Sequence, residues 1–493
     1  MSALLNIWPI ARFLGRLLLV LGAAELVPTV VCLIYGETEA AFAFVLTAAV
    51  TGGCGLACIW LGRGGGELYR REGILIVVGG WVLASIFGAL PYLLTGTLTH
   101  PVDALFESAS GFTTTGASVM LDIQSSGRGI LFWRSFTQWL GGMGIIVLFV
   151  ALLPELGPGA RFLYKLEVPG PTAETLHPRV HDTAAVLWRL YLAFTAVQVV
   201  LLWLAGLDLY DALTHTFSTL STGGFSPYNA SAAGFSPLVQ IILIVFMVLA
   251  GINFSLYYGL KRQGGLRSIV GDHELRIYLA LTFGVALVIS WDLLHHGGYA
   301  AGAGGEALLD GLFQVASILT TTGFATEDFD RWPNLSRVLL VGLMFVGGCA
   351  GSTSGGVKIM RFVIGLKAAS REVRLMFSPS HVLTVVVGGK PVPNAIVRSV
   401  VGFFLLYILA WGLGTLALSV GHDSVPGFGL DTAATASIAT LGNIGPGLDL
   451  VGPTMGFAFF APWQKLVMVL LMWLGRLEIY AILAVMTLAF WRR

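Results

Sequence analysis

Four short segments rich in threonine and glycine recur along this chain, about a hundred residues apart. Each contains the pattern Thr-x-Gly, which occupies Thr114–Gly116, Thr222–Gly224, Thr321–Gly323 and Thr440–Gly442. Threonine offers a hydroxyl, and glycine permits a positive φ that can turn successive carbonyl oxygens toward one axis. Four such loops around one axis could replace the water around a dehydrated monovalent ion, so the pattern predicts a cation filter.

The candidate filter residues are the three of each pattern and the one that follows. They are Thr114, Thr115, Gly116, Ala117, Thr222, Gly223, Gly224, Phe225, Thr321, Thr322, Gly323, Phe324, Thr440, Leu441, Gly442 and Asn443. A single Thr-Thr-Gly sequence is usually a surface turn, but four copies between hydrophobic segments favour a pore. The residue after the glycine varies, so we expect a filter less rigid and less exacting than one built from identical copies.

Each loop follows a short stretch that begins with aspartate, at Asp103, Asp211, Asp310 and Asp431. The spacing from Asp to Gly is the same in the first three and two residues shorter in the fourth. Aspartate can cap the N-terminus of a helix, which predicts short helices over 104–110, 212–218, 311–317 and 432–437. Such helices cannot cross a bilayer and must re-enter, with the negative end of their dipoles toward the membrane centre, where it favours a cation.

The composition is that of a polytopic membrane protein. Of the 493 residues 56% are hydrophobic and 11% are charged, whereas a soluble domain carries about 25% charged residues. Stretches long and apolar enough to cross a bilayer lie near 13–35, 41–61, 74–95, 130–153, 183–206, 237–258, 275–294, 336–366 (interrupted), 394–420 and 464–490. The last eight pair around the four loops, and the first two form an added hairpin.

The predicted fold is an all-α polytopic membrane protein with four pseudo-repeats around one central pore, preceded by an N-terminal two-helix hairpin. Each repeat consists of a helix, a re-entrant pore loop and a second helix. The predicted divisions are 1–66 for the hairpin and 67–157, 158–263, 264–375 and 376–493 for the repeats, with an intramembrane gating loop in the third.

The basic residues predict the orientation. If the N-terminus is cytoplasmic and the spans alternate, most of the 28 Lys and Arg residues fall on the cytoplasmic side, as the positive-inside rule requires. Both termini are then cytoplasmic and the Thr-x-Gly loops lie on the outer side. Arg12 and Arg16 before Leu17–Ala24 resemble a signal sequence, but no Ala-x-Ala cleavage signal follows, so we expect an uncleaved first helix.

A break in the second helix of repeat three suggests a gate. Val338–Val346 is followed by residues 347–356, most of them glycine, serine or threonine. This run could pack against a neighbouring helix, or it could be a flexible loop that obstructs the path beneath the filter. Arg476 is a basic residue at the centre of a spanning segment, where a charge is usually functional. It could belong to a structural ion pair, or it could face the pore and raise an electrostatic barrier.

Three classes of function remain to be compared. The first is a channel-like ion-conducting subunit. The second is a symporter coupled to protons or sodium. Proton coupling is weakened but not excluded, because no acidic residue other than Glu25 and Glu478 lies near the middle of the predicted spans. The third is a membrane-embedded enzyme, for which the sequence has no His-Glu-x-x-His motif and no paired intramembrane aspartates. We therefore expect no enzyme, and the formal charge of +1 gives no sign of a nucleic-acid partner.

The chain resembles the Trk/Ktr/HKT superfamily of potassium transporters, and within it the TrkH-type membrane subunits, which share the added N-terminal hairpin. Three features carry the resemblance over essentially the whole chain. They are the four filter loops, the glycine-rich run Gly347–Lys358 and the run Gly475–Tyr480.

The resemblance implies potassium uptake across the bacterial cytoplasmic (inner) membrane, with the potassium ion as substrate at the filter and no cofactor in this chain. It implies that the intramembrane loop is the gate and that Arg476 projects toward the pore. The gate residues are then Gly347, Gly348, Gly351, Ser352, Thr353, Ser354, Gly355, Gly356, Lys358 and Arg476. TrkH-like subunits are homodimers on a cytoplasmic TrkA-like ring of nucleotide-binding regulatory subunits. ATP, ADP or NAD is expected on that ring, since no Walker or GxGxxG loop is apparent in this chain.

Overall fold

The computed structural model describes residues 6–63, 69–144, 180–262, 271–300, 302–381, 383–422 and 425–491. Within them the chain is almost entirely helical, apart from one antiparallel pair of two-residue strands, β1 (Val386–Val387) and β2 (Lys390–Pro391). The predicted divisions at 66/67, 157/158 and 263/264 lie outside the described residues, as does the end of the span predicted at 130–153.

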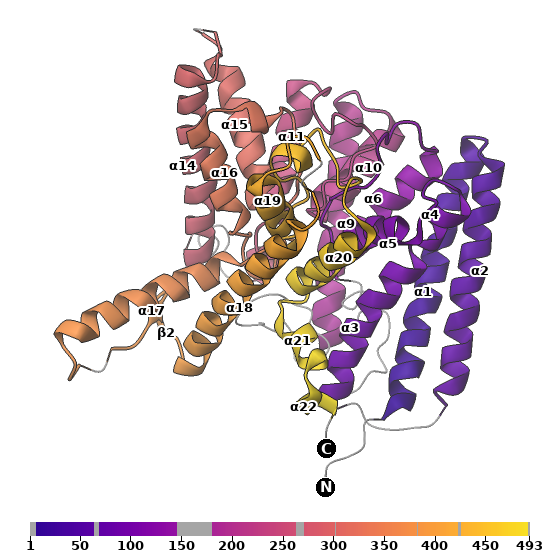
Figure 1. The fold of residues 1–493 in the computed structure, drawn as a ribbon, viewed down its shortest axis with the longest axis horizontal. Coiled ribbons are helices and arrows are strands. Elements are labelled where there is room, and N and C mark those ends of the chain that lie inside the picture. The colour runs from indigo at the N-terminus through magenta and orange to yellow at the C-terminus, as the bar shows by residue number, and fades with distance from the viewer. Residues whose placement is uncertain are drawn as a thin grey trace.

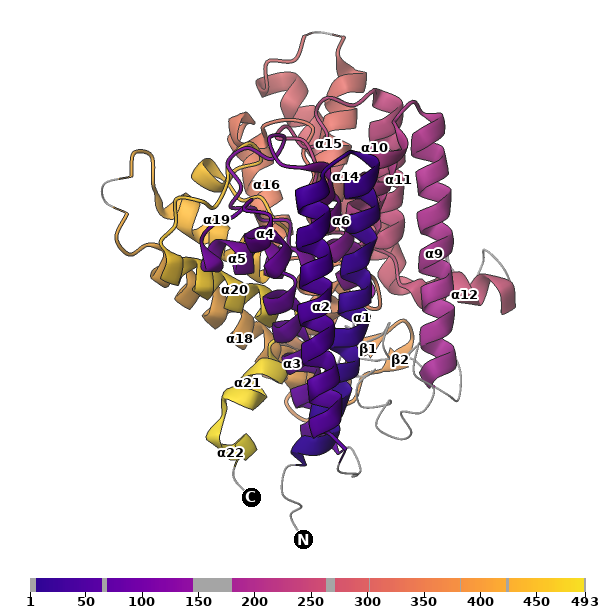
Figure 2. The same cartoon turned by 90° about the vertical axis from the view of Figure 1, so that its right-hand side faces the viewer.

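The predicted N-terminal hairpin consists of α1 (Ile7–Ile34) and α2 (Thr38–Leu61), which lie side by side (Figure 2). Small residues let the two backbones approach closely. A Cβ on Gly55 would lie 2.8 Å from the carbonyl oxygen of Gly15, and one on Gly22 would lie 3.1 Å from that of Ala48. Close packing through small residues is how helices associate in lipid, where little hydrophobic force draws them together.

In each of the four predicted repeats, a long helix is followed by a shorter, buried one. The first helices are α3 (Arg70–Phe87) with its continuation α4 (Leu90–Leu94), α9 (Val180–Leu204), α14 (His273–His296) and α18 (Asn394–Leu418). Together with α1 and α2 they make six helices, among the described residues, that are long and apolar enough to cross a membrane. The re-entrant pore helices are α5 (Pro101–Phe112), α10 (Leu209–Leu220), α15 (Gly304–Leu319) and α19 (Leu430–Leu441).

The pore helices begin earlier than the sequence predicts, and their caps differ. The predicted N-caps Asp103, Asp211, Asp310 and Asp431 all lie inside the helices. The side chains of His100 and Asp208 cap α5 and α10 instead. Asp103 forms an ion pair at 2.6 Å with Lys465 of repeat four. Asp103, Asp211 and Asp431 lie in the first turn, where an acidic residue suits the helix dipole as well as a cap does. Asp310 lies in the second turn, because α15 begins at Gly304.

The second helix of each repeat stops part of the way along its predicted span. These helices are α6 (Arg128–Gly142), α11 (Pro237–Ala250), α16 (Asn334–Met344) and α20 (Pro462–Arg476). The break predicted in repeat three is present between α16 and α17 (Ile359–Phe377). The spans predicted as continuous at 237–258 and 464–490 are broken too, since α12 (Phe254–Arg262) follows α11, and α21 (Tyr480–Met486) and α22 (Leu488–Trp491) follow α20.

The two unpredicted breaks have local causes. In repeat two, the Asn253 side chain accepts a hydrogen bond from the backbone N–H of Ser255 at 2.9 Å, as at the start of a new helix. In repeat four, Glu478 and Ile479 have φ of 54° and 63°, and Tyr480 N donates to Glu478 O at 2.6 Å. That geometry is a γ-turn, which is rare and strained. Asn253 and Ile479 are neither glycine nor proline, and Gly251, the C-cap of α11, is a single glycine of a kind that spanning helices also tolerate. Neither break was therefore marked strongly enough to predict.

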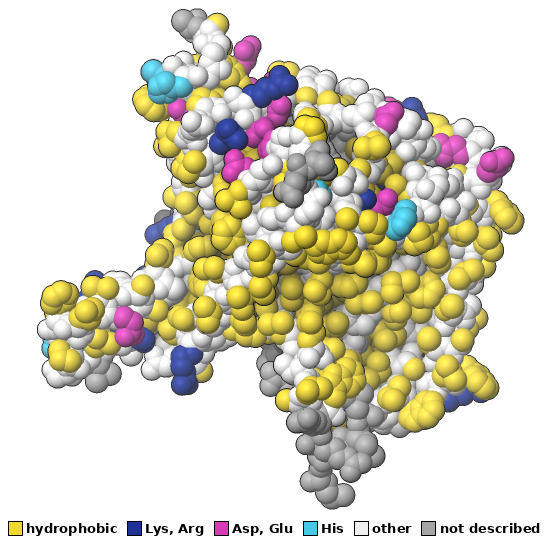
Figure 3. All heavy atoms as spheres, in the orientation of Figure 1, with side chains coloured by type: hydrophobic (Ala, Val, Ile, Leu, Met, Phe, Trp, Pro, Cys, Tyr) yellow, Lys and Arg dark blue, Asp and Glu magenta, His cyan; other side chains and the backbone are white. Residues whose placement is uncertain are grey.

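The outer shape agrees with a multi-pass membrane protein. The start of α1 and the end of α22 lie at the same end of the molecule, and α17 projects away from the body (Figure 1). Apolar side chains cover the middle of the visible face, while charged side chains gather toward its two ends (Figure 3). Two short 3-10 turns, Phe329–Arg331 and Asp449–Val451, lie in the connections that follow pore helices α15 and α19.

The hairpin packing yields a test. Gly55→Ala should lower the free energy of unfolding by about 1–3 kcal/mol, because the added Cβ would press on the Gly15 carbonyl. Thermal unfolding in detergent measures the effect. Gly53→Ala is the matched control, since a Cβ there meets nothing within 4 Å. A loss for Gly53→Ala as large as that for Gly55→Ala would contradict the proposed packing.

Candidate functional site

Each pore helix ends in the same backbone turn, and these turns carry the candidate filter. The residue after the helix cap is left-handed, with φ of 54° to 57°, at Thr114, Thr222, Thr321 and Asn443. The next N–H reaches back to the helix, Thr115 to the Ser110 carbonyl at 2.8 Å and Ile444 in the same way at 2.9 Å. This is a Schellman cap. A glycine with positive φ follows in each quarter, at Gly116, Gly224, Gly323 and Gly445.

The four loops form a closed ring. Each of these glycines lies against the carbonyl oxygen that precedes the glycine of the next quarter. A side chain on Gly116 would collide with Gly223 O, on Gly224 with Thr322 O, on Gly323 with Ile444 O, and on Gly445 with Thr115 O. Each glycine is therefore needed both for its conformation and for the close approach of its neighbour.

The fourth quarter departs from its predicted register by three residues. Thr440 and Leu441 are the last residues of α19, and Gly442 is its C-cap with φ of −80°. Asn443 takes the threonine position and Gly445 the glycine position. One cavity, here called the mouth cavity, is lined by the ring glycines Gly116, Gly224, Gly323 and Gly445 and does not include Gly442. The alignment on Gly442 is wrong, because Thr-x-Gly does not mark the turn in this quarter.

The residues predicted to follow the ring glycines pack behind the ring. Ala117, Phe225 and Phe324 are each at most 2% exposed. Asn443 does more than replace a threonine, because its side-chain N–H donates to the Thr115 hydroxyl at 3.0 Å and to the Met472 carbonyl at 3.0 Å. Quarter four is thereby tied to quarter one.

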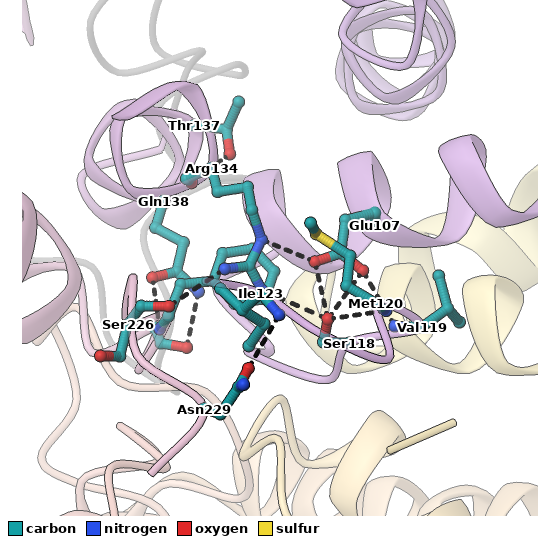
Figure 4. A network of polar contacts seen from close by, with 12 residues as sticks. Glu107, Ser118, Val119, Met120, Ile123, Arg134, Thr137, Gln138, Ser226 and Asn229 are labelled. Atoms are coloured by element: carbon teal, nitrogen blue, oxygen red, sulfur yellow. Dashed lines mark hydrogen bonds and ion pairs between the residues drawn. The ribbon is translucent and has the colours of Figure 1, made fainter. Parts of the chain in front are cut away.

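A buried ion pair that the sequence analysis did not single out supports quarters one and two (Figure 4). Arg134 Nε of α6 lies 2.8 Å from Glu107 Oε1 of α5, and both side chains are at most 1% exposed. Glu107 also accepts from the Ser118 hydroxyl and from Val119 N, each at 3.0 Å. Arg134 donates to the Ser226 carbonyl, just beyond quarter two, at 3.2 Å. The signal available in the sequence was an acidic residue within a re-entrant helix.

Gln138, one turn after Arg134 on α6, binds quarter two directly. Its Nε2 donates to the carbonyl of Gly223 at 2.6 Å, and its Oε1 accepts from the backbone N–H of Phe225 at 3.0 Å. The role of Gln138 beside the ring was not predicted from the sequence either, because a glutamine in an apolar helix belongs to no recognisable motif.

A carboxylate lies beside the mouth cavity, whose own lining, among the described residues, includes the paired Arg134 and no acidic residue. Asn229, which lines the cavity, donates to Asp122 Oδ1 at 2.8 Å and accepts from Ile123 N at 2.8 Å. The hydrogen bond from Asn229 lowers the pKa of Asp122 below its ordinary value. This carboxylate is therefore ionised at neutral pH, where it attracts cations.

The loop between α16 and α17, residues 345–358, lies directly against the ring and is called the gating loop below, after the role that the sequence predicts for it. Gly355 N donates to the Thr321 hydroxyl of quarter three at 2.6 Å. Cys349 N donates to Gly251 O, in the break of repeat two, at 2.9 Å. The loop is closed at its base where Gly347 N donates to Val357 O at 2.8 Å. The predicted gate residues thus form one folded segment beneath the filter.

Arg476 joins the filter to the gating loop. One guanidinium nitrogen donates to the hydroxyl of Thr114 and to the carbonyl of Thr353, each at 3.0 Å. The other donates to the carbonyls of Gly141 and Gly142, at 2.6 and 2.9 Å, where α6 ends. The predicted position of Arg476 beneath the filter agrees with these contacts.

A second cavity lies on this lower side. It is lined by the gating-loop residues Gly351, Ser352, Ser354, Gly355, Gly356 and Lys358, together with Arg476 and Glu478. Lys358 is 1% exposed and donates to the Ser354 hydroxyl at 3.1 Å and to the Gly355 carbonyl at 3.3 Å. Gly348 lies outside this lining, against the break of repeat two. Two cationic side chains therefore face the space beneath the ring, while Glu478 pairs with Arg361.

Glu274, at the start of α14, holds both sides of the gating loop, and the sequence analysis missed it. Its Oε1 accepts from Ala350 N at 2.9 Å and from Met360 N at 3.1 Å. Glu274 lies at the edge of a predicted span, 76 residues before Ala350 of the gating loop in the sequence. Nothing in the sequence connects the two, so this contact could not be predicted.

Membrane-crossing helices that surround four re-entrant helices, whose ends meet at one ring, define a multi-pass membrane transport protein. The chain belongs to the TrkH family of cation transport proteins, whose family model matches residues 41–490. It is similar to the Trk system potassium uptake protein TrkH of Escherichia coli (strain K12), with 38% identity over 489 residues, 98% of this chain and 99% of that protein.

Two further comparisons agree over the full length. The Trk system potassium uptake protein TrkH of Vibrio parahaemolyticus is 40% identical over 491 residues, which cover 98% of this chain and 99% of that protein. The crystal structure of the potassium transporter TrkH from Vibrio parahaemolyticus matches with a TM-score of 0.87 and 37% identity, covering 99% of this chain and all of that one. The family is one of transport proteins, not of enzymes.

The buried ion pair yields a stability test. Arg134→Met should lower the free energy of unfolding by about 3–5 kcal/mol, because it leaves the Glu107 carboxylate buried without its cation. Unfolding in detergent measures the loss. Arg331→Met is the control, since Arg331 is 86% exposed in its pair with Asp328, and it should change stability by no more than about 0.5 kcal/mol. Equally small changes for both variants would refute a supporting role for the buried pair.

Proposed function

We propose that this chain is the ion-conducting subunit of a potassium uptake system in the bacterial cytoplasmic membrane, and that it works like a channel. The observation that supports this most strongly is the closed ring of backbone carbonyls at residues 115, 223, 322 and 444, each against a glycine of the adjacent quarter. Carbonyl oxygens held in place can substitute for the hydration shell of an ion. Potassium is the ion named for relatives that are 38–40% identical over the full length.

In this proposal an ion enters the mouth cavity, loses water at the ring and continues toward the lower cavity. The pore helices direct their C-terminal ends at the ring, and the partial negative charge of those ends favours a cation. Asp122 adds attraction at the entrance. Each contribution acts without any group changing its protonation, so conduction needs no chemical step.

The gating loop and Arg476 form the obstruction on the inner side. The loop occupies the space beneath the ring through the contact of Gly355 with Thr321. Arg476 places a positive charge beside Thr114. A cation about 8 Å from that charge is repelled by about 2 kcal/mol at an effective dielectric of 20, which slows passage more than tenfold.

Opening is controlled from the cytoplasmic side in this proposal. Both termini are cytoplasmic, two copies form a homodimer, and a TrkA-like ring that binds ATP, ADP or NAD docks beneath the pore. The exposed cations Lys367 and Arg374 on the projecting helix α17 support such a docking surface, because α17 continues directly from the gating loop. A movement of α17 would pull on Lys358 and the loop.

Coupled symport is the competing mechanism. Glu25 belongs to the N-terminal hairpin, outside the four repeats, and Glu478 is paired with Arg361. Neither carboxylate stands on the ring, which favours conduction without proton coupling. Reversal potentials measured against separate potassium and proton gradients decide the question, since a symporter shifts with both and a channel with potassium alone.

The corrected register yields a prediction about selectivity. Gly445→Ser should reduce the ratio of potassium to sodium permeation about tenfold, as should Gly224→Ser, because a side chain there opposes the positive φ and displaces a neighbouring carbonyl. Bi-ionic potentials of protein in liposomes measure the ratio.

Gly442→Ala is the comparison, since its φ of −80° suits any residue. Its Cβ would press on the Ile444 side chain at 2.8 Å and not on a ring carbonyl, so the ratio should fall much less than for Gly445→Ser. A ratio that falls for Gly442→Ala and not for Gly445→Ser would restore the original alignment.

The proposed barrier yields a second functional prediction. Arg476→Ala should raise basal potassium flux more than tenfold, because both the charge and its bond to the Thr353 carbonyl are removed. Arg476→Lys keeps the charge and should retain most of the barrier. Rubidium uptake into liposomes, together with unfolding temperature, measures the outcome. A well-folded Arg476→Ala protein with unaltered flux would exclude the barrier, and poor folding would indicate a structural role.

A further inference from the structure

Quarter two of the ring differs from the others at one position. The residue whose carbonyl contributes to the ring is Thr115, Thr322 or Ile444 in three quarters and Gly223 in the second. A β-branched side chain restricts its own residue and packs against its surroundings, whereas glycine has the greatest conformational freedom. Quarter two therefore needs another source of rigidity for its ring carbonyl.

The Gln138 side chain occupies the space that a side chain at position 223 would fill. A Cβ built on Gly223 would lie 2.6 Å from Gln138 Oε1 and 2.8 Å from Gln138 Nε2. The amide also brackets the ring glycine Gly224, since it donates to the Gly223 carbonyl and accepts from the Phe225 N–H. A carbonyl can only accept and an N–H can only donate, so these two bonds fix the orientation of the amide.

The other quarters show what this clamp replaces. In quarters one and three the threonine of the ring is tied within its own loop, Thr115 to Thr113 at 2.8 Å and Thr322 to Thr320 at 2.7 Å. Quarter two has no side chain at this position, and its tie comes from helix α6 of another repeat.

Gln138 occupies a place on its helix that is apolar in the three corresponding helices. It is the eleventh residue of α6, and the eleventh residues of α11, α16 and α20 are Met247, Met344 and Met472. All four side chains are fully buried. An apolar residue suits this place in three repeats, so a buried amide in the first is retained for its two hydrogen bonds, which outweigh the desolvation of its polar atoms.

We propose that Gln138 is a specificity-determining residue, a clamp across repeats that fixes the Gly223 carbonyl in the ring and thereby excludes sodium. Without the clamp this carbonyl can move inward and surround a smaller ion. The proposal rests on the proposed function of the ring as a potassium filter. It goes further by assigning discrimination in quarter two to a side chain outside the filter loops.

The test compares variants of the full chain in liposomes, with bi-ionic potentials for potassium against sodium as the readout. Gln138→Met, which reproduces the residue of the other three repeats, should reduce the permeability ratio about threefold to tenfold, because two hydrogen bonds to quarter two are lost. Unfolding temperature is measured in parallel and should fall modestly, because the Gly223 carbonyl and the Phe225 N–H lose their buried partner. Met247→Leu, the volume-conserving control at the matched place, should leave the ratio unchanged.

A rescue experiment separates the clamp from general packing. Gly223→Thr alone should be damaging, since its side chain meets the Gln138 amide. Gln138→Ala alone should lower the ratio as Gln138→Met does. The double variant Gln138→Ala, Gly223→Thr restores the pattern of quarters one and three, and its ratio should be at least about threefold above that of Gln138→Ala alone.

The outcomes are distinct. A wild-type ratio in Gln138→Met, or a double variant no more selective than Gln138→Ala, overturns the clamp. Gly224→Ser serves as reference in the same measurement. If Gly224→Ser lowers the ratio and Gln138→Met does not, the clamp alone fails. If neither changes the ratio, the filter proposal fails as well.

Discussion

The close approach of four backbone loops is the constraint on which the rest of the structure depends. Each ring glycine touches the carbonyl of the adjacent quarter, so no quarter can take its conformation alone. The pore helices must end at one level, which the Schellman turns achieve. The second helices stop short of their predicted length. The space below the ring is therefore left for the gating loop and for the side chains of Lys358 and Arg476. Irregular backbone at this depth is tolerable because it is enclosed by protein.

Thr114 and Thr321, at the ends of α5 and α15, belong to the ring and also contact the groups beneath it. Thr114 and Thr321 take a left-handed conformation that is unfavourable for β-branched residues. Their hydroxyls then receive hydrogen bonds from Arg476 and from the gating loop. The lower side of the ring is therefore in direct contact with Arg476 and the gating loop. A displacement of either the ring or the gating loop would change these hydrogen bonds. Glu274 and the break at Gly251 hold the loop from the opposite side.

Composition and repetition were enough to predict the long apolar helices, the presence of the four short helices and the break in repeat three, but not the breaks after α11 and α20 or the caps of the short helices. The register of quarter four was not predictable, since its Thr-x-Gly falls on the end of α19 and the left-handed turn begins one residue later, at Asn443. Asn443 also hides the repeat, because a short amide tolerates the left-handed conformation as threonine does here. The ion pair of Glu107 with Arg134 and the clamp of Gln138 join residues of different repeats, and one sequence carries no record of such pairings.

A single polypeptide supplies the whole ring, and this has a consequence for how the protein is made. The contact of Gly445 with the Thr115 carbonyl and the ion pair of Lys465 with Asp103 join the first repeat to the last. During synthesis the earlier repeats enter the membrane with their carbonyl edges still lacking a neighbour, and the final hundred or so residues complete the circle. Premature termination anywhere before repeat four therefore leaves an open arc that lacks the carbonyl of Ile444 and the contact of Gly445.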